Sequence, residues 1–550
     1  MPSNGRLLPA IISCLLPAAL LLPTGARAQL FDAHRTQWID QVPFPGEDAE
    51  QGDRFGRALA SGDLDCDGFD DLIVGVPLES LGVNNSLVRA GTVHVLFGGV
   101  AGLTFADART ITEGDLFGAV STSSAEFGKV LAVGDFDGDG CDDLAIGVPE
   151  VDQGGLDDVG AVWEIPGGPG GPELSLARRW SQADPDISDG VEALDHFGSS
   201  LATGDLNGDG FDDLAIGGFG EAIGSLASAG AVWLLPGGPD GLRGAFDAPT
   251  GWRQLINQGL GAVDETAEVN DRFGTATEIC DLDGDGIDDL IVSASGEDEE
   301  PELDNGVVHF FASTAAGVLP TDHPDPGSLP QAARYGPEGE GMGFSLASGE
   351  VSAPPDDCIV LASAPLASDG IGRVNLFSLF QPLGMGTFIH QGTVGEVLEE
   401  DDLFGWAMAT GDFGGAPGRE EAVLASPGEH VPGFIAQSHG MVHISHPSTR
   451  DVVGFAPFTN RWTNAHSGSH EQPPGPPRSR AQFGYALAAG DFDGDGFDDL
   501  AIAAPDAHVF SRRGVGQSDA GAVQVLYAAQ LLFSDGFEAG NALVWSSVVP

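Results

Sequence analysis

The sequence has very few positively charged side chains. Lys and Arg together number 22 against 83 Asp and Glu, which gives a formal net charge of −61 over 550 residues. Lys129 is the only lysine. Nucleic acids and anionic membrane surfaces are themselves polyanions, so this composition disfavours both as partners. It favours cations instead.

Cysteine is also scarce. Beyond the N-terminal segment there are four, Cys66, Cys141, Cys280 and Cys358, and none forms a C-x-x-C pair, so a zinc site of that type has no support. Each lies in a different stretch of chain, so a disulfide would have to link separate structural units. We therefore expect four independent, small, buried side chains.

Long apolar runs are missing after the N-terminus. Residues 7–23 form one run, interrupted by proline, between Arg6 and the cleavage pattern Ala26-Arg27-Ala28. The run is too short and too broken to span a membrane. It predicts a secretory signal peptide over residues 1–28 and export of the rest. A lipoprotein signal ending at Cys14 is the alternative.

Sequence motifs of catalysis are absent as well. The chain has no G-x-S-x-G, H-E-x-x-H or P-loop pattern. His439, His443 and His446 fall around one expected strand. Side chains alternate along a strand, so His443 and His446 should face opposite sides, which disfavours a shared metal site. We predict no catalytic residue and no enzymatic activity.

What the chain does have is a repeat. An FG pair, a short apolar stretch, an acidic loop of pattern D-x-D/N-x-D-G-x-x-D and a second apolar run occur together five times. The copies span residues 55–77, 127–149, 197–218, 273–295 and 483–505. Two further copies, at 342–365 and 404–427, keep the flanks without the acidic loop. A second signature, a Gly and then an alternating strand, begins near Ala90, Gly160, Ala229, Asn305, Ile371, His439 and Ala520. Both counts give seven units.

Each unit is expected to hold four antiparallel strands. The first three, A to C, fall at 58–62, 71–76 and 92–97 in the first unit. The weaker strand D carries a tryptophan in several units, at Arg179-Trp180, Gly251-Trp252 and Arg461-Trp462. Seven such units predict an all-β, seven-bladed β-propeller over residues 29–533. The strand around Trp38 would complete the last blade and close the ring.

These residues resemble the FG-GAP repeat, the unit of integrin α-subunit propellers and of many secreted bacterial proteins. The resemblance covers about residues 38–532 and implies a calcium-binding propeller. The C-terminal residues 534–550 resemble a short tail of secreted bacterial proteins, either a sorting or surface-retention signal or an extra edge strand.

The acidic loops predict five structural Ca²⁺ sites, because carboxylates at loop positions 1, 3, 5 and 9 with a carbonyl at position 7 can surround one ion. An all-protein oxygen cage disfavours Mg²⁺, and five loops in register are more than turn formation explains. The predicted ligands are Asp63, Asp65, Asp67, Phe69 and Asp71; Asp135, Asp137, Asp139, Cys141 and Asp143; Asp205, Asn207, Asp209, Phe211 and Asp213; Asp281, Asp283, Asp285, Ile287 and Asp289; and Asp491, Asp493, Asp495, Phe497 and Asp499. The segments 350–356 and 412–420 lack most of these carboxylates, and we predict no ion in either.

Function is expected on the face opposite these loops. The B–C and D–A connections there are long and varied, for example residues 78–89, 150–159, 297–304 and 467–481. No single residue among them stands out, and Glu297 to Glu300 fit a solvated loop. By resemblance we expect a secreted binding or adhesion module for an extracellular protein or glycan. The alternatives are a polysaccharide-active enzyme with carboxylates at the channel mouth, or an inert structural envelope protein.

Overall fold

The computed structural model describes residues 31–44, 49–83, 85–187, 189–244, 248–249, 252, 254–258, 266–298, 305–318, 341–349, 358–377, 388–391, 399–416, 419–429, 440–445, 460–462, 481–510 and 516–528. The predicted signal peptide (1–28), the C-terminal tail (534–550), His439, His446, Glu299, Glu300 and the segment 350–356 lie outside these residues. None of the described helices is long and apolar enough to cross a membrane.

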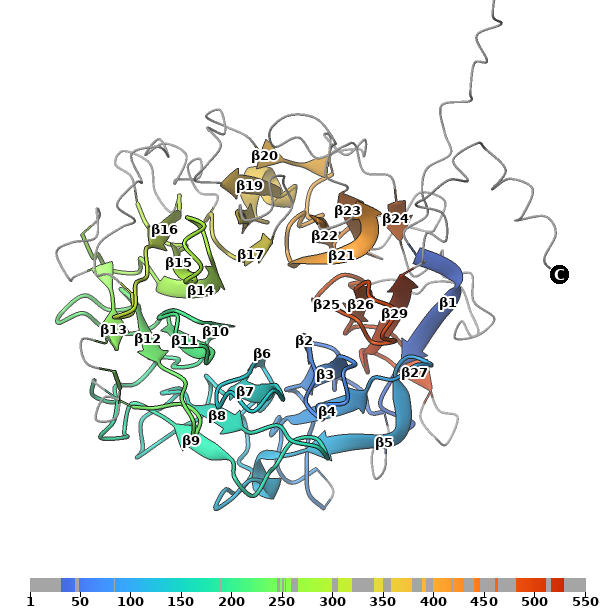
Figure 1. The fold of residues 1–550 in the computed structure, drawn as a ribbon, viewed down its shortest axis with the longest axis horizontal. Helices are drawn as coiled ribbons and strands as arrows, with labels where there is room; N and C mark the ends of the chain where they lie inside the picture. Colours follow the sequence, from blue (N-terminus) through green and yellow to red (C-terminus); the bar gives the residue numbers. More distant parts are fainter. Residues whose placement is uncertain are drawn as a thin grey trace, which may run out of the picture.

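Seven antiparallel sheets stand around a central opening, as Figure 1 shows. Blade 1 holds β2 (Ala58–Gly62), β3 (Asp71–Val76), β4 (Thr92–Phe97) and β5 (Thr104–Ile111). Blade 2 holds β6 (Val130–Gly134), β7 (Asp143–Gly147), β8 (Val162–Ile165) and β9 (Arg178–Trp180), after the short 3-10 helix η1 (Glu113–Asp115). Blade 3 holds β10 (Ser200–Gly204), β11 (Asp213–Gly218), β12 (Ala231–Leu235) and β13 (Leu255–Ile256).

The remaining blades follow the same order. Blade 4 shows β14 (Phe273–Cys280), β15 (Asp289–Ala294) and β16 (Val307–Phe311) in its described part. Blade 5 holds β17 (Leu346–Gly349), β18 (Ile359–Ala364), the one-turn helix α1 (Ala367–Gly370), β19 (Arg373–Phe377) and β20 (Phe388–Ile389). Blade 6 holds β21 (Met408–Ala416), β22 (Arg419–Ser426), β23 (Met441–Ser445) and β24 (Asn460–Trp462).

The last blade combines both ends of the chain. It consists of β25 (Leu487–Gly490), β26 (Asp499–Ala504), β29 (Ala522–Ala528) and, as its outermost strand, β1 (Phe31–Ile39), with a small hairpin of β27 (Val509–Phe510) and β28 (Gly516–Gln517) beside it. Trp38 pairs with Gln524 in the β1–β29 ladder. The innermost strands β2, β6, β10, β14, β17, β21 and β25 contact one another in a closed cycle. The predicted seven-bladed ring, closed by an N-terminal strand, is confirmed.

The FG pairs join neighbouring blades. The Phe197 backbone N donates to the Val159 carbonyl (3.1 Å), and Gly160 and Phe197 form a parallel bridge between blades 2 and 3. Gly160 has φ +85°, and a Cβ there would lie 2.2 Å from the Phe197 carbonyl oxygen, so only glycine fits. The Phe55 N to Ala520 O bond (2.9 Å) makes the same connection across the ring closure. This contact explains why FG and the Gly before strand C recur together.

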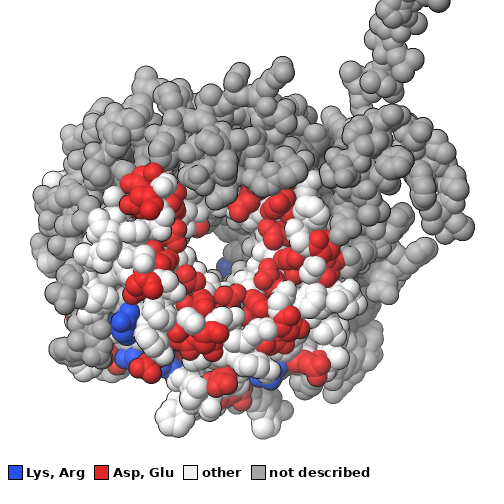
Figure 2. Space-filling model, in the orientation of Figure 1, with Lys and Arg blue, Asp and Glu red and all other residues white. Residues whose placement is uncertain are grey.

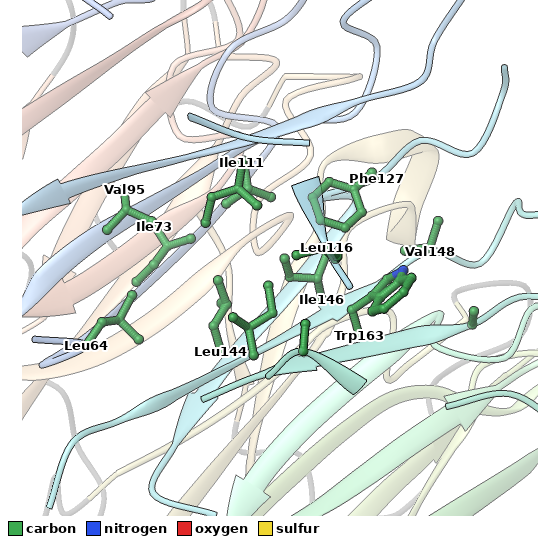
Figure 3. Packing of buried hydrophobic residues seen from close by; sticks show 14 of the residues in the cluster. Leu64, Ile73, Val95, Ile111, Leu116, Phe127, Leu144, Ile146, Val148 and Trp163 are labelled. Carbon is green, nitrogen blue, oxygen red and sulfur yellow. The ribbon is translucent and has the colours of Figure 1, made fainter. Parts of the chain in front are cut away.

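The hydrophobic core lies between blades. Ile73 and Val95 of blade 1 pack in one buried cluster with Leu144 and Ile146 of blade 2, and Phe127 at the start of blade 2 joins them (Figure 3). Similar clusters bridge the other junctions. Each blade therefore depends on its neighbours to cover its apolar faces.

One strand prediction was wrong. The fourth strand of blade 3 is Leu255–Ile256, paired with Trp233 and Val232, and does not include Trp252. Trp252 instead donates its Nε1 hydrogen bond to the Leu234 carbonyl (3.0 Å). Its side chain packs against the core between blades 3 and 4, and the later residues Leu255 and Ile256 form the ladder. Trp252 therefore indicated the region of the fourth strand correctly, but it is not one of the residues that pair in that strand.

Candidate metal centres and binding face

The acidic loops fold around the carboxylate at loop position 1. In blade 1, Asp63 Oδ1 accepts a hydrogen bond from the Asp67 N (3.0 Å) and Oδ2 accepts one from the Gly68 N (2.9 Å). Asp67 Oδ1 accepts one from the Phe69 N (3.1 Å). Gly68, at loop position 6, has φ +87°, a left-handed conformation that glycine adopts readily. Four further loops repeat this pattern around Asp135, Asp205, Asp281 and Asp491.

The carboxylate at position 9 is buried and anchors the loop to the turn between strands C and D. Asp71 Oδ2 accepts from the Leu64 N (3.0 Å), and Oδ1 accepts from the Gly98 N (2.9 Å). Asp143, Asp213 and Asp289 make the same two bonds in their blades, and Asp499 accepts a bond from the Ala528 N. The carboxylate at position 9 therefore both anchors the loop and faces its centre.

The structure brings the predicted carboxylates together. Asp63, Asp65 and Asp71 each offer an oxygen within 4.8 Å of the other two, as do Asp135, Asp137 and Asp143, and Asp281, Asp283 and Asp285. Two oxygens on one Ca²⁺ can lie up to about 5 Å apart, so the spacing fits this ion. Asn207, at position 3 of blade 3, places its amide 3.2 Å from Asp213 Oδ2. At position 7, the residues Phe69, Cys141, Phe211, Ile287 and Phe497 each donate their backbone N to the position 5 carboxylate.

The electrostatics of the loops call for a counter-ion. Burial, with smaller contributions from neighbouring loop carboxylates, raises the pKa of Asp71, Asp213 and Asp499 to about 8 and that of Asp143 and Asp289 to about 7. Such groups either hold a proton or need a cation beside them. Arg243 forms an ion pair with Asp209 of the blade 3 loop (3.5 Å). The donor set, all hard oxygens, suits Ca²⁺.

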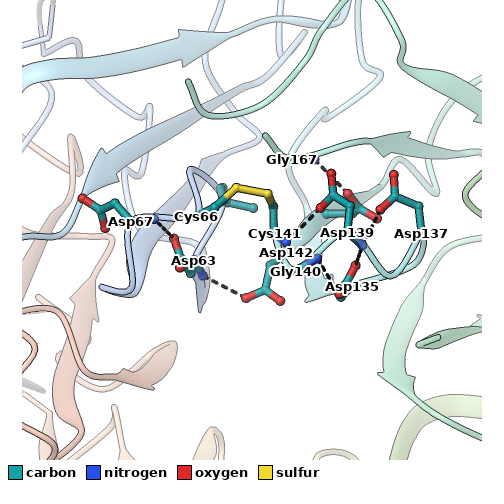
Figure 4. Close-up of a disulfide and its surroundings, with 12 residues drawn as sticks. Asp63, Cys66, Asp67, Asp135, Asp137, Asp139, Gly140, Cys141, Asp142 and Gly167 are labelled. Carbon is teal, nitrogen blue, oxygen red and sulfur yellow. Dashed lines mark hydrogen bonds between the residues drawn. A yellow bond between two sulfur atoms is a disulfide. The ribbon is translucent and has the colours of Figure 1, made fainter. Parts of the chain in front are cut away.

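Loop position 8 carries a role that we did not predict. Asp142 Oδ2 accepts a hydrogen bond from the Asp63 N (2.8 Å), and the Asp142 N donates to the Asp63 carbonyl (2.9 Å), so two successive loops hold each other (Figure 4). Asp70, Asp212, Asp288 and Asp498 connect to the preceding blade in the same way. In the sequence, the signal for this contact was the repeated Asp-Asp pair at loop positions 8 and 9. Its first member faces the neighbouring blade, and its second member faces the loop.

The prediction of four independent cysteines was wrong. Disulfides join Cys66 to Cys141 and Cys280 to Cys358, with Cα atoms 4.8 and 6.4 Å apart, and each links adjacent blades. Cys66 stands at loop position 4 and Cys141 at position 7 of the next loop. In the next pair of blades these positions hold Gly138 and Phe211, and a Cβ on Gly138 would lie 2.6 Å from that ring.

The second disulfide follows the same logic. Cys280 stands where blade 1 has Gly62, and Cys358 stands where blade 2 has Asp142; a Cβ on Gly62 would lie 2.5 Å from that carboxylate. Both bonds therefore replace a contact that other blade junctions make without covalent linkage. Sequence spacing alone does not reveal which loop positions touch across a junction.

In blade 6 the acidic loop is replaced by an extended hairpin. β21 and β22 pair from Met408 and Leu424 to Ala416 and Arg419. Phe413 N donates to Glu421 Oε2 (3.0 Å), as Leu64 N does to Asp71 in blade 1. The anchoring carboxylate is thus retained while the loop that precedes it is reshaped. His443, of the three histidines noted in the sequence, is buried on β23 against Phe404.

Two faces result from this arrangement. The Asp-loop face carries the A–B loops and the C–D turns; the FG face carries the FG pairs and the B–C and D–A connections. Figure 2 shows one face of the propeller, where Asp and Glu side chains gather along the described part of the rim of the central opening. Exposed apolar side chains lie mostly on the FG face. They are Val83, Val88, Phe117, Val120, Leu156, Leu194, Val269 and Leu366, against Val100 and Leu176 on the Asp-loop face.

An aromatic arc at the inner rim of the FG face was missed in the sequence. It consists of Phe344, Trp406, Tyr485 and Arg57, each the residue directly after an FG or equivalent pair and therefore at the start of an innermost strand. Ring centroids lie 4.9 Å apart for Phe344–Trp406 and 5.4 Å for Trp406–Tyr485. The Arg57 guanidinium lies 4.9 Å from the centre of the Tyr485 ring. In the sequence, the signal for this arc was the large side chain that recurs directly after the FG or equivalent pair.

Comparison with known proteins agrees with this architecture. Residues 55–96, 127–165, 197–235, 273–311 and 483–526 match the family described as FG-GAP repeat. The protein is thus an all-β, seven-bladed propeller that carries FG-GAP repeats, and it is similar to integrin α subunits. Integrin alpha-5 of Xenopus laevis is 31% identical over 251 residues, which cover 44% of this chain and 20% of the integrin.

A second group of relatives are enzymes by name. Phosphatidylinositol-glycan-specific phospholipase D of Bos taurus is 34% identical over 167 residues, covering 30% of this chain and 18% of that protein. The chain thus spans about a fifth of the length of these curated relatives. Among solved structures, the exotype rhamnogalacturonan lyase YesX aligns over 90% of this chain and 76% of its own, with 12% identity and a TM-score of 0.40. At that score the likeness has no bearing on activity.

Proposed function

We propose that this protein is an exported, calcium-stabilised binding module, and that its FG face binds an extracellular protein or glycan at the rim of the central opening. The aromatic arc carries this proposal. Phe344 is 37% exposed, and Trp406, Tyr485 and Arg57 are partly exposed, although all four stand on a framework whose neighbouring strands are buried. Solvent-facing rings with a guanidinium beside them are the groups that most often anchor ligands.

Calcium has a structural role in this proposal. Five loops each gather hard oxygen ligands and are fastened to the next blade, so an ion in the loop holds the junction together. The ligands would be the loop residues named above, with the carboxylates as the charged donors. The binding surface lies on the other face, so calcium supports it through the framework rather than by direct contact.

Similarity to the integrins supports a binding role, and the absence of a catalytic sequence motif agrees with it. Fold likeness alone does not establish function, and the phospholipase relatives and the acidic rim in Figure 2 favour testing for an enzyme as well. A polysaccharide-active enzyme is the second candidate, and an inert envelope protein the third.

The test uses the calcium-loaded protein on a panel of polysaccharides and extracellular proteins, scoring retained protein and released products in the same wells. We expect retention without products, and loss of at least tenfold in affinity in Trp406→Ala/Tyr485→Ala. Phe388→Ala is the control, because Phe388 is about as exposed (39%) as Phe344 of the arc but lies on an outermost strand. Product release, or equal retention of the arc variant and the control, would overturn the proposal.

A further inference from the structure

A second set of carboxylates is buried on the FG face, away from the acidic loops. In blade 3, Asp195 precedes the FG pair by two residues and Glu221 follows β11; they are 1% and 4% exposed. Glu192, which is exposed, completes the group, and one oxygen of each lies within 4.8 Å of the other two. The Glu192 N donates to Asp195 Oδ2 (2.8 Å).

A buried glutamine reaches into this group from the preceding blade. Gln182 follows β9, the outermost strand of blade 2, and is 3% exposed. Its Nε2 donates to Glu221 Oε2 (2.7 Å), while its buried Oε1 has no hydrogen-bond partner among the described residues. Rotation of the amide by 180° exchanges the two atoms and turns Oε1 toward the carboxylates. In that orientation Oε1 is able to coordinate a cation held by the three carboxylates.

The same arrangement occurs at four blade junctions. The sets are Gln41, Glu50, Asp53 and Glu79; Gln182, Glu192, Asp195 and Glu221; Gln258, Glu268, Asp271 and Glu297; and Gln391, Glu399, Asp402 and Glu429. In each, the glutamine Nε2 donates to the last glutamate at 2.5 to 2.8 Å. In each, the glutamine Oε1 is buried and finds no hydrogen-bond partner in the described part of the chain. The glutamine, the aspartate and the last glutamate are buried in all four sets.

In blades 2 and 7 the two buried carboxylates are replaced together. In blade 2 the aspartate and the last glutamate become Ala125 and Val151, which pack in a hydrophobic cluster, and Glu113 takes the glutamine position. In blade 7 the same two positions hold Ala481 and Ala507, again in a hydrophobic cluster. At these two junctions both acidic positions are apolar, whereas blade 5 has Glu340 at the first position, outside the described residues, and Ala367 at the second. Joint replacement in blades 2 and 7 supports the view that the oxygens act as one unit.

The oxygen set needs a proton or a cation. Burial, followed by the charges of Asp195, Asp189 and Glu192, raises the pKa of Glu221 to about 8. No ion pair within the described residues involves Glu192, Asp195 or Glu221. Three carboxylates and an amide oxygen are hard donors, the type that Ca²⁺ prefers. Glu192 leaves the group open to solvent, so an ion has a path to it.

We propose that Gln182 Oε1, Glu192, Asp195 and Glu221 form a binding site for a divalent, calcium-like cation, and that the three equivalent junctions form further sites. The ion would tie the end of an outermost strand to the start of the next blade, as the acidic loops do at the other face. A ring of sites on each face would then fasten the propeller. This inference concerns the FG face and does not depend on the adhesion role or on occupancy of the loops.

The site is tested by counting bound Ca²⁺ in equilibrium dialysis of the full exported chain. Asp195→Asn/Glu221→Gln removes two charges while keeping size and hydrogen-bonding capacity. We expect it to bind one Ca²⁺ fewer than wild type. Glu113→Gln is the control, because it changes the equivalent junction that lacks the acidic partners, and it should bind the same number as wild type.

Thermal melting and diffraction separate the site from a mere hydrogen-bond network. In EGTA the double variant should melt at or above the wild-type temperature, since two repelling carboxylates are gone; in calcium it should melt below it. A crystal grown with Ca²⁺ should show anomalous density about 2.3 to 2.6 Å from the Glu221, Asp195 and Gln182 oxygens. Unchanged calcium stoichiometry, or no density at this position, would overturn the proposal whatever the loops bind.

Discussion

Asp63 and Asp142 hold the first two blades together through a reciprocal pair of hydrogen bonds. The Asp63 N donates to Asp142 Oδ2 at 2.8 Å, and the Asp142 N donates to the Asp63 carbonyl at 2.9 Å. Asp63 is also the central acceptor of its own acidic loop. The same residue therefore organises a loop and receives the neighbouring blade, which couples the loops to one another around the ring.

Removing this inter-blade carboxylate should weaken the fold. Asp142→Ala leaves the Asp63 N without its acceptor, and a part-buried donor without a partner costs about 1 to 3 kcal/mol. Urea unfolding in saturating calcium measures the loss. Asp240→Ala, at an exposed position, is the control and should change stability by under about 0.5 kcal/mol. Equal midpoints for the two variants would contradict the assigned role.

Calcium should stabilise the protein strongly. With a dissociation constant of about 0.1 mM and about 2 mM calcium, each loop site adds about 1.8 kcal/mol. Five sites approach about 9 kcal/mol, comparable to the whole stability of a domain. A thermal melt in calcium and in EGTA measures this directly, with Mg²⁺ as the control cation. A melting temperature that EGTA leaves unchanged would refute structural calcium sites.

The calcium effect should grow with pH. Without metal, the pKa of Asp71 is raised from 3.8 to about 8 by burial, so the folded state holds its proton more tightly than the unfolded state does. Between those two values, the stability of the metal-free protein therefore falls as the pH rises. Calcium must displace these protons, so it binds better at higher pH. The difference in melting temperature between calcium and EGTA should be larger at pH 8 than at pH 6; a constant difference would contradict this.

The inter-blade disulfide should contribute several kcal/mol. The bond between Cys66 and Cys141 closes a loop of 75 residues, for which chain entropy gives about 4 kcal/mol. Cys66→Ser/Cys141→Ser should lose much of that in denaturant unfolding. Cys66→Gly/Cys141→Phe restores the Gly–Phe contact found at the next junction and should lose less. If both double variants unfold like wild type, the bond is not a stabilising link.

Acid should destabilise blade 1 through a buried histidine. His94 is 0% exposed, and burial lowers its pKa from 6.5 to about 3, so the folded state keeps it neutral while the unfolded state takes up a proton. Stability is then lost as the pH falls from about 6.5 toward 3, by about 2.3 kcal/mol between pH 6.5 and 4.5. Gln524 fills the equivalent position in blade 7. His94→Gln should show a shallower decline below pH 6.5 when both proteins are normalised to pH 7; parallel curves would exclude His94 as the cause.

Much of the fold was predictable because the unit repeats. Seven copies of the same short strands, each with one apolar face too small to stand alone, require neighbours on both sides, and a closed ring supplies them. The strand around Trp38 could be assigned to the last blade because the final unit lacked one. The acidic loops could be predicted because carboxylate spacing within nine residues is local, and Gly68 marks the turn by its permitted backbone conformation.

Contacts between units were not predictable, because a repeat describes one blade and says little about which positions meet across a junction. The disulfides of Cys66 and Cys280, the carboxylate of Asp142 and the arc of Phe344, Trp406 and Tyr485 all join residues about 60 or more positions apart. Only closure of the ring brings them together. The sequence alone determined the blade, its strands and the ligand pattern of its loop; the tertiary structure decided the junctions, because their geometry depends on how each blade is rotated against the next.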